Sequence, residues 1–368
     1  MLDSLYIKNF RVLKELKIDS LSQVNLITGK NNTGKSTILE ALAIYASRGD
    51  LSQIYQLLNY RGEDYRLKDN IYNEPKEIVE NNLRSLSSMF TNRKTIFTRN
   101  EGIQIGSNEN RLNLRFAKYM NQLLVKEQGE TYQSTVLIPE NKTNVKDFKA
   151  AFEIKLNYDA KVIPLDETNF FHLNFEEQAN HENYQLIRTC VINKTTNSKL
   201  FDHIALTDKE NYVIEALRII EPTTERIAFI ENRLGERTAV IKLPNQPKVL
   251  PLQSMGDGIN RILTIILAMV NADNGYFLLD EFENGLHYSV QEQLWKIIFK
   301  LAQELNVQVF ATTHSNDCIA GFEQALNDQS NQVSGKLIRL DNINGTIRPV
   351  TYSPDEIKIA TNQNIEVR

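Results

Sequence analysis

The chain has 368 residues, of which 41% are hydrophobic and 24% charged, and this length allows roughly two domains. Its 42 basic and 46 acidic side chains leave a formal charge of -4, so no overall positive field draws the protein onto nucleic acid or anionic lipid. Cys190 and Cys318 form no C-x-x-C pair, which excludes a disulfide framework and a thiolate zinc site. The longest apolar run, 262–270, is too short to cross a bilayer, and no signal peptide opens the chain. We therefore expect a cytoplasmic protein that contacts no membrane.

The first fifty residues predict three strands and a helix. Residues 5–10 and 16–18 alternate apolar and polar side chains, and 24–28 form a short apolar run. From Lys35 onwards apolar side chains recur at helical spacing, and this helix is expected to end near residues 48–50. A strand therefore leads through a glycine-rich loop into a helix.

Periodicity is weak between residues 51 and 239, where the surroundings are polar and rich in asparagine. The elements predicted there are helices over 54–58, 78–89 and 210–220 and strands over 152–158 and 184–192. Thr207 followed by Glu210 predicts a capping box at the start of the helix over 210–220. We interpret 51–239 as an insertion of mixed helices and strands into a domain formed by 1–50 and 240–368.

Strong patterns return in the last third of the chain. The elements predicted there are a hairpin around 232–236, a buried helix over 258–270, a strand over 276–279, an amphipathic helix over 290–305, a strand over 307–312 and a closing hairpin of 336–340 with 346–350. Asn344-Gly345 is the turn signal of that last hairpin. The strand, helix, strand order predicts parallel strands flanked by helices, which is an α/β fold.

The glycine-rich loop matches the phosphate-binding pattern G-x-x-x-x-G-K-[ST]. It lies where the mechanism requires, between a buried strand and a helix N-terminus, so that backbone N–H groups can surround phosphates. Lys35 is expected to contact the β- and γ-phosphates, and Ser36 to bind Mg²⁺. The predicted nucleotide-binding residues of the loop are Gly29, Asn31, Asn32, Thr33, Gly34, Lys35, Ser36 and Thr37.

The apolar strand over 276–279 ends in two carboxylates, Asp280 and Glu281. Alone, this pattern is typical of a solvated strand end, but together with the phosphate loop it favours a nucleotide site. Asp280 would hold Mg²⁺ through its water shell. Glu281 would orient and polarise the attacking water, because in-line attack on the γ-phosphate needs an acceptor opposite the leaving oxygen.

Two weaker motifs accompany these. Ser254-Met255-Gly256 lies directly before the buried helix, where it offers a hydroxyl and free N–H groups to an anion, although alone it is more simply an ordinary N-cap. His314 follows the strand over 307–312 and so lies near the same sheet edge. A single histidine is usually a packing or surface residue, and only the order of the motifs makes His314 a candidate γ-phosphate sensor.

That order of motifs resembles the ABC-type ATPase heads of the SMC, RecF and OLD proteins. The opening Ile7-Lys8-Asn9-Phe10-Arg11 is similar to the first strand of those heads, and Glu283-Asn284-Gly285-Leu286-His287 is similar to the D-loop of OLD-like members. More loosely, the whole chain, including the closing Ile365-Glu366-Val367-Arg368, resembles bacterial OLD-like ATPases associated with phage defence. The fold implied is an ABC-type ATPase head.

The resemblance implies a homodimer or higher homo-oligomer in which Ser254 and Gly256 of one subunit bind the γ-phosphate held by Lys35 of another. In the Ser-x-Gly signature motif of these heads, Met255 replaces the usual first glycine. The Q-loop glutamine of the family has only weak candidates here, Gln53 and Gln56. OLD nucleases also carry a TOPRIM metal-nuclease domain. Because no Asp-x-Asp cluster follows the Thr-His-Ser motif, a TOPRIM-like nuclease would be a separate partner chain.

Other candidate sites are weaker. His172, His181 and His203 are too scattered for a metal set, and Glu176-Glu177 is most simply a solvated face. A diffuse basic run with few aromatic residues could touch nucleic-acid phosphates, but it is a poor platform for single strands. This run consists of Lys142, Lys146, Lys149, Lys155 and Lys161.

We therefore expect a cytoplasmic ATPase that dimerises around ATP with Mg²⁺ and controls an effector, a TOPRIM-like nuclease, in anti-phage defence. One alternative is a RecF-like or SMC-like ATPase of DNA repair or maintenance, although the chain has no heptads for a coiled-coil arm. Another is a nucleotide-gated scaffold with slow turnover. An ABC transporter subunit fits less well, because those subunits are compact.

Overall fold

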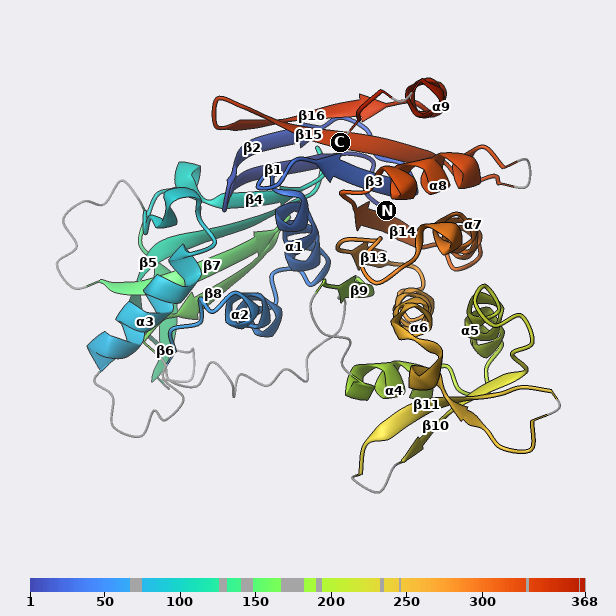
Figure 1. Ribbon diagram of the computed structural model, residues 1–368. Coiled ribbons are helices and arrows are strands. Elements are labelled where there is room, and N and C mark those ends of the chain that lie inside the picture. The colour runs from blue at the N-terminus through green and yellow to red at the C-terminus, as the bar shows by residue number, and fades with distance from the viewer. Residues whose placement is uncertain are drawn as a thin grey trace.

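Two large sheets and one small sheet, with helices packed around them, make up the molecule (Figure 1). The computed structural model describes residues 1–66, 75–125, 131–139, 148–166, 182–189, 194–231, 235–244, 246–328, 331–363 and 365–367.

The first large sheet contains the strand that precedes the phosphate loop. Its order is β16 (Thr346–Tyr352), β15 (Gly335–Ile343), β3 (Val24–Gly29), β14 (Gln308–Thr312), β13 (Tyr276–Leu279) and β9 (Tyr184–Ile187). All neighbouring pairs are parallel except β15 with β16, which forms the predicted closing hairpin. Because parallel strands end on the same side, the residues after β3, β13, β14 and β9 meet at one edge of the sheet.

Helices cover both faces of this sheet. α1 (Lys35–Ala46) and α2 (Leu51–Tyr60) pack on one face, and α6 (Asp257–Val270), α7 (Tyr288–Glu304) and α8 (Asn316–Leu326) pack on the other. Strand β13 shows why both faces are apolar. Tyr276 and Leu278 belong to the hydrophobic core on the side of α1 and α2, and Phe277 and Leu279 belong to the core on the side of α6, α7 and α8. Side chains alternate along a strand, so a strand covered on both faces must be apolar throughout.

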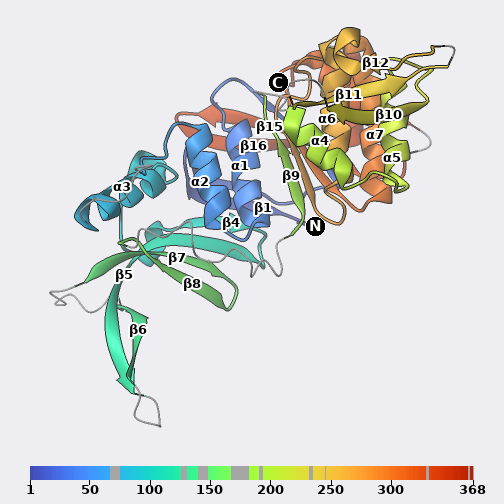
Figure 2. The ribbon, with the colours of Figure 1, turned by 90° about the horizontal axis from the view of Figure 1, so that it is seen from below.

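The second large sheet has seven strands and is antiparallel. Its order is β2 (Leu13–Ile18), β1 (Leu5–Phe10), β4 (Ile103–Gly106), β5 (Arg111–Val125), β7 (Lys149–Leu156) and β8 (Asp159–Pro164), with β6 (Thr131–Leu137) paired to β5. Strands from the N-terminus and from the middle of the chain therefore share one sheet. Figure 2 shows the β5–β6 ribbon projecting away from the helices, with α3 (Pro75–Ser87) beside this sheet.

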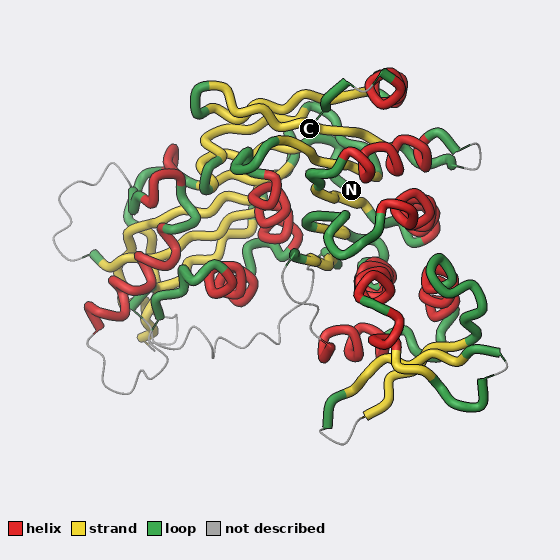
Figure 3. Tube along the Cα trace, in the orientation of Figure 1, coloured by secondary structure: helices red, strands yellow, loops and turns green. Residues whose placement is uncertain are grey.

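The small sheet consists of β10 (Arg226–Glu231), β11 (Arg237–Lys242) and β12 (Leu250–Pro251). Together with α4 (Lys194–Asp202) and α5 (Lys209–Leu217), it surrounds α6 (Figure 3). A short 3-10 helix, Leu252–Met255, leads into α6, and α9 (Pro354–Asn362) closes the chain.

The structure confirms the predicted fold class, an α/β sheet that carries the phosphate loop and is flanked by helices, with further mixed helices and strands. The division into 1–50 with 240–368 and an insertion of 51–239 stays a prediction. The structure adds that β9 pairs with β13 and that β4 pairs with β1, so parts of 51–239 extend both large sheets.

Two local predictions were wrong. The strand expected over 184–192 ends at Ile187. The capping box is absent, because α5 has Asp208 as its N-cap, without a side-chain cap bond. The Thr207 hydroxyl instead donates to the carbonyl oxygen of Ile204 at 2.6 Å, and it is therefore not directed at the helix N–H groups.

None of the helices in the described residues is long and apolar enough to span a bilayer.

Candidate nucleotide site

The phosphate loop connects the end of β3 to the start of α1. Its backbone has positive φ at Gly29 (142°), Asn32 (61°) and Gly34 (90°). Gly29 also needs the space of a missing side chain, since a Cβ there would lie 2.6 Å from the carbonyl oxygen of Leu340. Glycine is the residue that tolerates both demands, so the loop can turn tightly at the N-terminus of α1.

Lys35, the first residue of α1, folds back over this loop. Its Nζ donates to the carbonyl oxygens of Gly29, at 2.6 Å, and Lys30, at 3.0 Å, and the residue is only 6% exposed. Burial lowers the pKa of Lys35 to about 8, and the carboxylates of Asp280, Glu281 and Glu283 partly oppose this shift. The ammonium group is thus held beside the loop by two backbone carbonyl oxygens, where a phosphate would complete its surroundings.

The other loop residues divide by exposure. Thr33 is buried, and its hydroxyl donates to the carbonyl oxygen of Lys30 at 2.8 Å, which holds the loop together. Asn31 and Asn32 are exposed, whereas Thr37 is buried in the first turn of α1.

Asp280 is the point where four chain segments meet. Its Oδ1 accepts from the Ser36 hydroxyl at 3.0 Å and from the Thr312 hydroxyl at 2.7 Å, and its Oδ2 accepts from the Thr189 hydroxyl at 3.5 Å. These donors follow from the sheet order, because Thr312 ends β14 and Thr189 follows β9, the two strands on either side of β13. The predicted pair of Ser36 and Asp280 is brought into direct contact.

The Ser36 hydroxyl and the Asp280 carboxylate are suitable ligands for Mg²⁺. A hydroxyl and a carboxylate are hard oxygen ligands, and Mg²⁺ usually takes few protein ligands and keeps several waters. Among the described residues, no group of three or more His, Cys, Asp or Glu side chains could hold a metal ion.

Glu281 has an unusual backbone. Its φ of 51° lies in the left-handed region, which costs a non-glycine residue of order 1 kcal/mol or more and persists only where neighbours enforce it. The neighbours here are the Thr312 hydroxyl, which accepts from the Glu281 N–H at 2.9 Å, and Arg261. Nη2 of Arg261 donates to the carbonyl oxygens of Asp280 and Glu281, each at 3.2 Å. Strain of this kind is typical of functional sites.

Glu283 fixes the segment that contains His314. Its Oε1 accepts from the His314 backbone N–H at 2.7 Å, and its Oε2 accepts from the Thr313 hydroxyl at 2.8 Å. The His314 residue is half-buried at the same sheet edge as Asp280 and Glu281. His287 lies elsewhere, at the exposed N-cap of α7, where its Nδ1 accepts from the Ser289 N–H at 3.4 Å.

Ser254 and Gly256 are exposed at the start of α6. The Ser254 hydroxyl donates to the carbonyl oxygen of Pro251 at 2.7 Å, and a Cβ at Gly256 would meet no atom within 4 Å. In the described part of the chain, neither residue forms a hydrogen bond with the phosphate loop. A single chain therefore brings together Lys35, Ser36 and the carboxylates, but it leaves Ser254 and Gly256 exposed to solvent.

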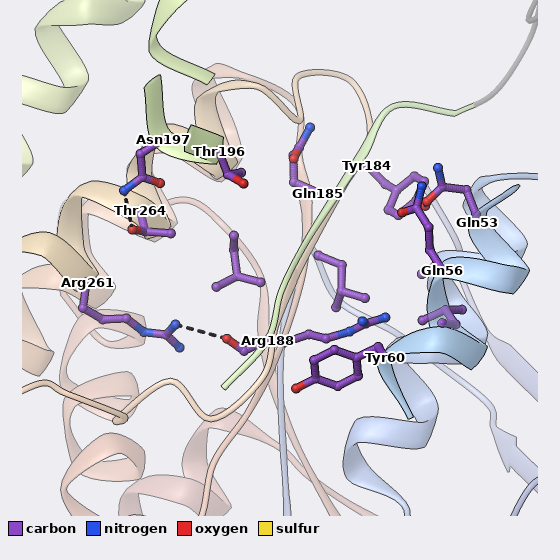
Figure 4. Close-up of a pocket in the computed structure, with 14 residues that line it drawn as sticks. Gln53, Gln56, Tyr60, Tyr184, Gln185, Arg188, Thr196, Asn197, Arg261 and Thr264 are labelled. Atoms are coloured by element: carbon purple, nitrogen blue, oxygen red, sulfur yellow. Dashed lines mark hydrogen bonds between the residues drawn. The ribbon is translucent and has the colours of Figure 1, made fainter. Parts of the chain in front are cut away.

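Sequence reasoning missed the contacts of Thr189, Thr312 and Arg261 at this site. It also missed the hydrogen bonds that Glu283 accepts from Thr313 and His314. One signal was available, since Arg261 is the one charged residue of the buried helix predicted over 258–270. Gln53 and Gln56 both lie on α2 (Figure 4), and Gln53 accepts a hydrogen bond from the Tyr184 hydroxyl at 2.7 Å.

Of the remaining sequence candidates, those in the described part of the chain do not join this site. Cys318 is a buried free thiol on α8, and Lys149 pairs with Asp166 at 2.8 Å. His203 directly follows α4. The candidates Lys142, Lys146, His172, Glu176, Glu177, His181 and Cys190 lie outside the described residues.

Comparison with known proteins identifies relatives. A model of the AAA ATPase domain family matches residues 1–319. An "ATP/GTP phosphatase" of Helicobacter pylori is 28% identical over 388 residues, covering 97% of both chains. The DNA replication and repair protein RecF of Francisella tularensis subsp. novicida is 28% identical over 114 residues, 28% of this chain and 32% of that one. A solved SMC head bound to the C-winged helix domain of ScpA covers 96% of this chain and 98% of its own, with a TM-score of 0.49 and 13% identity.

Proposed function

Because the chain belongs to the AAA ATPase domain family, we propose that it binds ATP with Mg²⁺ at the phosphate loop and hydrolyses it to ADP and phosphate. One observation carries this proposal. The Ser36 hydroxyl is hydrogen-bonded to Asp280, so the helix after the phosphate loop and the end of β13 meet at one point. Phosphoryl transfer needs this meeting of a phosphate cradle and a metal-binding carboxylate.

Each group has a role that follows from its position. The backbone N–H groups at the start of α1 and the Lys35 ammonium would hold the β- and γ-phosphates. Ser36 and Asp280 would hold Mg²⁺, which when bound neutralises negative charge on the phosphates. Glu281 would accept a proton from the attacking water as the bond between the γ-phosphorus and the β,γ-bridging oxygen breaks, and His314 would contact the γ-phosphate.

Two variants test the hydrolytic roles separately. Lys35→Ala should abolish measurable ATP binding, because it removes the cation at the phosphates. Glu281→Gln should keep ATP binding but lower phosphate release about 100-fold or more, because it removes the proton acceptor. Phosphate release and ATP binding are measured on both proteins. An unchanged hydrolysis rate in Glu281→Gln would contradict the general-base role and favour a slow nucleotide-gated scaffold.

The wider role is an ATP-closed dimer that controls an effector, a TOPRIM-like nuclease on a separate chain, in anti-phage defence. Its support is the resemblance of the ordered motifs from Gly29 to His314 to OLD-like ATPases. Phage plating on cells that carry the wild-type operon or the Lys35→Ala operon tests the role, with protection expected only from the wild type. Capture of tagged Glu281→Gln protein with ATP and Mg²⁺ should recover the nuclease, and equal plating would exclude the defence role.

A second candidate is a DNA repair or maintenance ATPase, which the partial similarity to RecF favours. It predicts DNA binding that increases with ATP and is lost on charge reversal of a basic patch. DNA binding that is absent or independent of nucleotide would count against it.

A further inference from the structure

A cavity of about 700 Å³ lies along β9, outside the candidate nucleotide site (Figure 4). β9 is the edge strand of its sheet, and residues 184–188 line the cavity. Gln53, Gln56 and Tyr60 of α2 lie on one side, and residues of α4 and α6 lie on the other (Figure 4). No residue of the phosphate loop lines this cavity.

The cavity is positively charged. Arg188 and Arg261 both line it, and none of its described lining residues is a carboxylate. The Arg188 guanidinium lies over the Tyr60 ring, 4.1 Å from its centroid, and forms no ion pair with any described residue. Burial lowers the pKa of both arginines, although both side chains remain charged. The carboxylates of Asp280, Glu281 and Glu283 oppose this shift at Arg261, and Glu40 opposes it at Arg188. Arg188, which forms no ion pair with a described residue, is therefore the cation that favours an anionic ligand.

Two buried polar atoms at the cavity lack partners. Arg261, 3% exposed, donates through its Nη atoms to backbone carbonyl oxygens, but its Nε has no hydrogen-bond partner among the described residues. Asn197, 5% exposed, donates through Nδ2 to the Thr264 hydroxyl at 2.8 Å, and its Oδ1 likewise has no partner there. An unsatisfied buried polar atom costs about 1–3 kcal/mol. One donor and one acceptor are therefore available to a ligand.

The opposite wall offers neutral groups. On the α2 side, Gln56 presents an amide, Tyr184 presents a ring and Tyr60 presents a hydroxyl, while Gln185 lies on the other side of β9 (Figure 4). Such groups suit the edge and face of a polar ring. The volume lies within the range of pockets that bind small molecules.

We propose that this cavity binds a phosphorylated small molecule of nucleotide size, at a site separate from the phosphate loop. Its phosphate would interact with Arg188, its ring would contact the amide-bearing wall, and its other polar groups would meet Arg261 and Asn197 on the other side of β9 (Figure 4). Because Arg261 also holds the carbonyl oxygens of Asp280 and Glu281, the bound molecule would lie one side chain away from the candidate nucleotide site.

Calorimetric titration with AMP, GMP and ribose 5-phosphate tests the proposal. The titrations use Lys35→Ala protein, and also wild-type protein with the phosphate loop saturated by ADP and Mg²⁺, so that binding at the loop does not contribute. We expect saturable binding of at least one mononucleotide in both preparations. Binding of ribose 5-phosphate with similar affinity would identify a sugar phosphate, and nucleotide binding alone would identify a base-specific site.

Variants locate the binding. Arg188→Gln should weaken affinity about tenfold or more, since a charge-assisted hydrogen bond is lost, and Arg188→Lys should restore part of it. Arg226→Gln, which removes an exposed arginine on β10, is the matched control and should bind like the parent protein. Thermal unfolding of each variant checks the fold. The proposal is overturned if none of the three probes binds, or if Arg188→Gln and Arg226→Gln bind equally well.

Discussion

The hydroxyl group of Thr312 contacts both acidic residues of the candidate nucleotide site, the carboxylate of Asp280 and the backbone N–H of Glu281. It is fully buried, donates to Asp280 and accepts from the Glu281 N–H. Thr312→Val keeps the shape of the side chain but removes both hydrogen bonds. We expect ATP turnover to fall about tenfold or more and the free energy of unfolding to fall by about 1–3 kcal/mol.

Thr28→Val is the matched control. Thr28 is also fully buried, on β3, but its hydroxyl has no hydrogen-bond partner in the described residues. Its replacement should leave turnover unchanged and should not lower the free energy of unfolding. Phosphate release and urea unfolding are measured on both variants. If the two substitutions lower turnover equally, the hydroxyl of Thr312 has no special role.

Lys35 makes ATP affinity depend on pH. With a pKa of about 8 in the nucleotide-free protein, the ammonium is mostly protonated at pH 7 and only about one-tenth protonated at pH 9. If ATP binds the protonated form, the apparent Kd should rise about tenfold between these values. Equilibrium titration at both pH values measures the change, and the Lys35→Met variant, which lacks the ammonium, should show no measurable ATP binding at either pH. A wild-type Kd that is constant with pH would contradict the assignment.

The same shift affects stability in a defined direction. Since the pKa of Lys35 is lower in the folded than in the unfolded chain, the unfolded chain binds more protons between about pH 8 and the ordinary lysine pKa. The contribution of Lys35 to stability therefore rises with pH across that window, while its contribution to phosphate binding falls.

At the level of elements, the sequence predicted the parts of the fold that have strong local patterns. The helix after the phosphate loop, the buried α6 and the parallel pair β13 and β14 were all expected. Asp280 and Ser36 could be assigned because parallel strands end at one edge. The contacts of Thr189 could not be anticipated, because they depend on β9, a four-residue strand that pairs with a strand distant in sequence. Such pairing leaves no periodicity to detect.

Gly275 controls how closely β9 approaches β13. A Cβ at this position would lie 1.8 Å from the carbonyl oxygen of Asn183, which also accepts from the Tyr276 N–H at 2.9 Å. Gly275→Ala should therefore push the start of β9 outwards and lower the free energy of unfolding by about 1–3 kcal/mol. Turnover should fall too, because Thr189 follows β9. Urea unfolding and hydrogen exchange at 184–187 measure the effect, and unchanged exchange would contradict this account of Gly275.

At the scale of the whole molecule, we propose that a second copy completes the site of each chain. Lys35 and the carboxylates converge within the chain, while Ser254 and Gly256 remain exposed. If a second copy supplies Ser254 and Gly256, then Lys35→Ala and Ser254→Arg should each be inactive as pure proteins. Their mixture should regain activity, because a mixed dimer contains one site with an intact phosphate loop and an intact Ser254.

The size of this recovery is set by mixing. If the two variants pair at random, half of the dimers in an equal mixture are mixed, and each has one intact site of two. We therefore expect about one-quarter of wild-type phosphate release, provided that each site acts independently. Sedimentation of Glu281→Gln with ATP and Mg²⁺ should show dimers. A mixture as inactive as its components, together with monomers under all nucleotide conditions, would show that each chain uses its site alone.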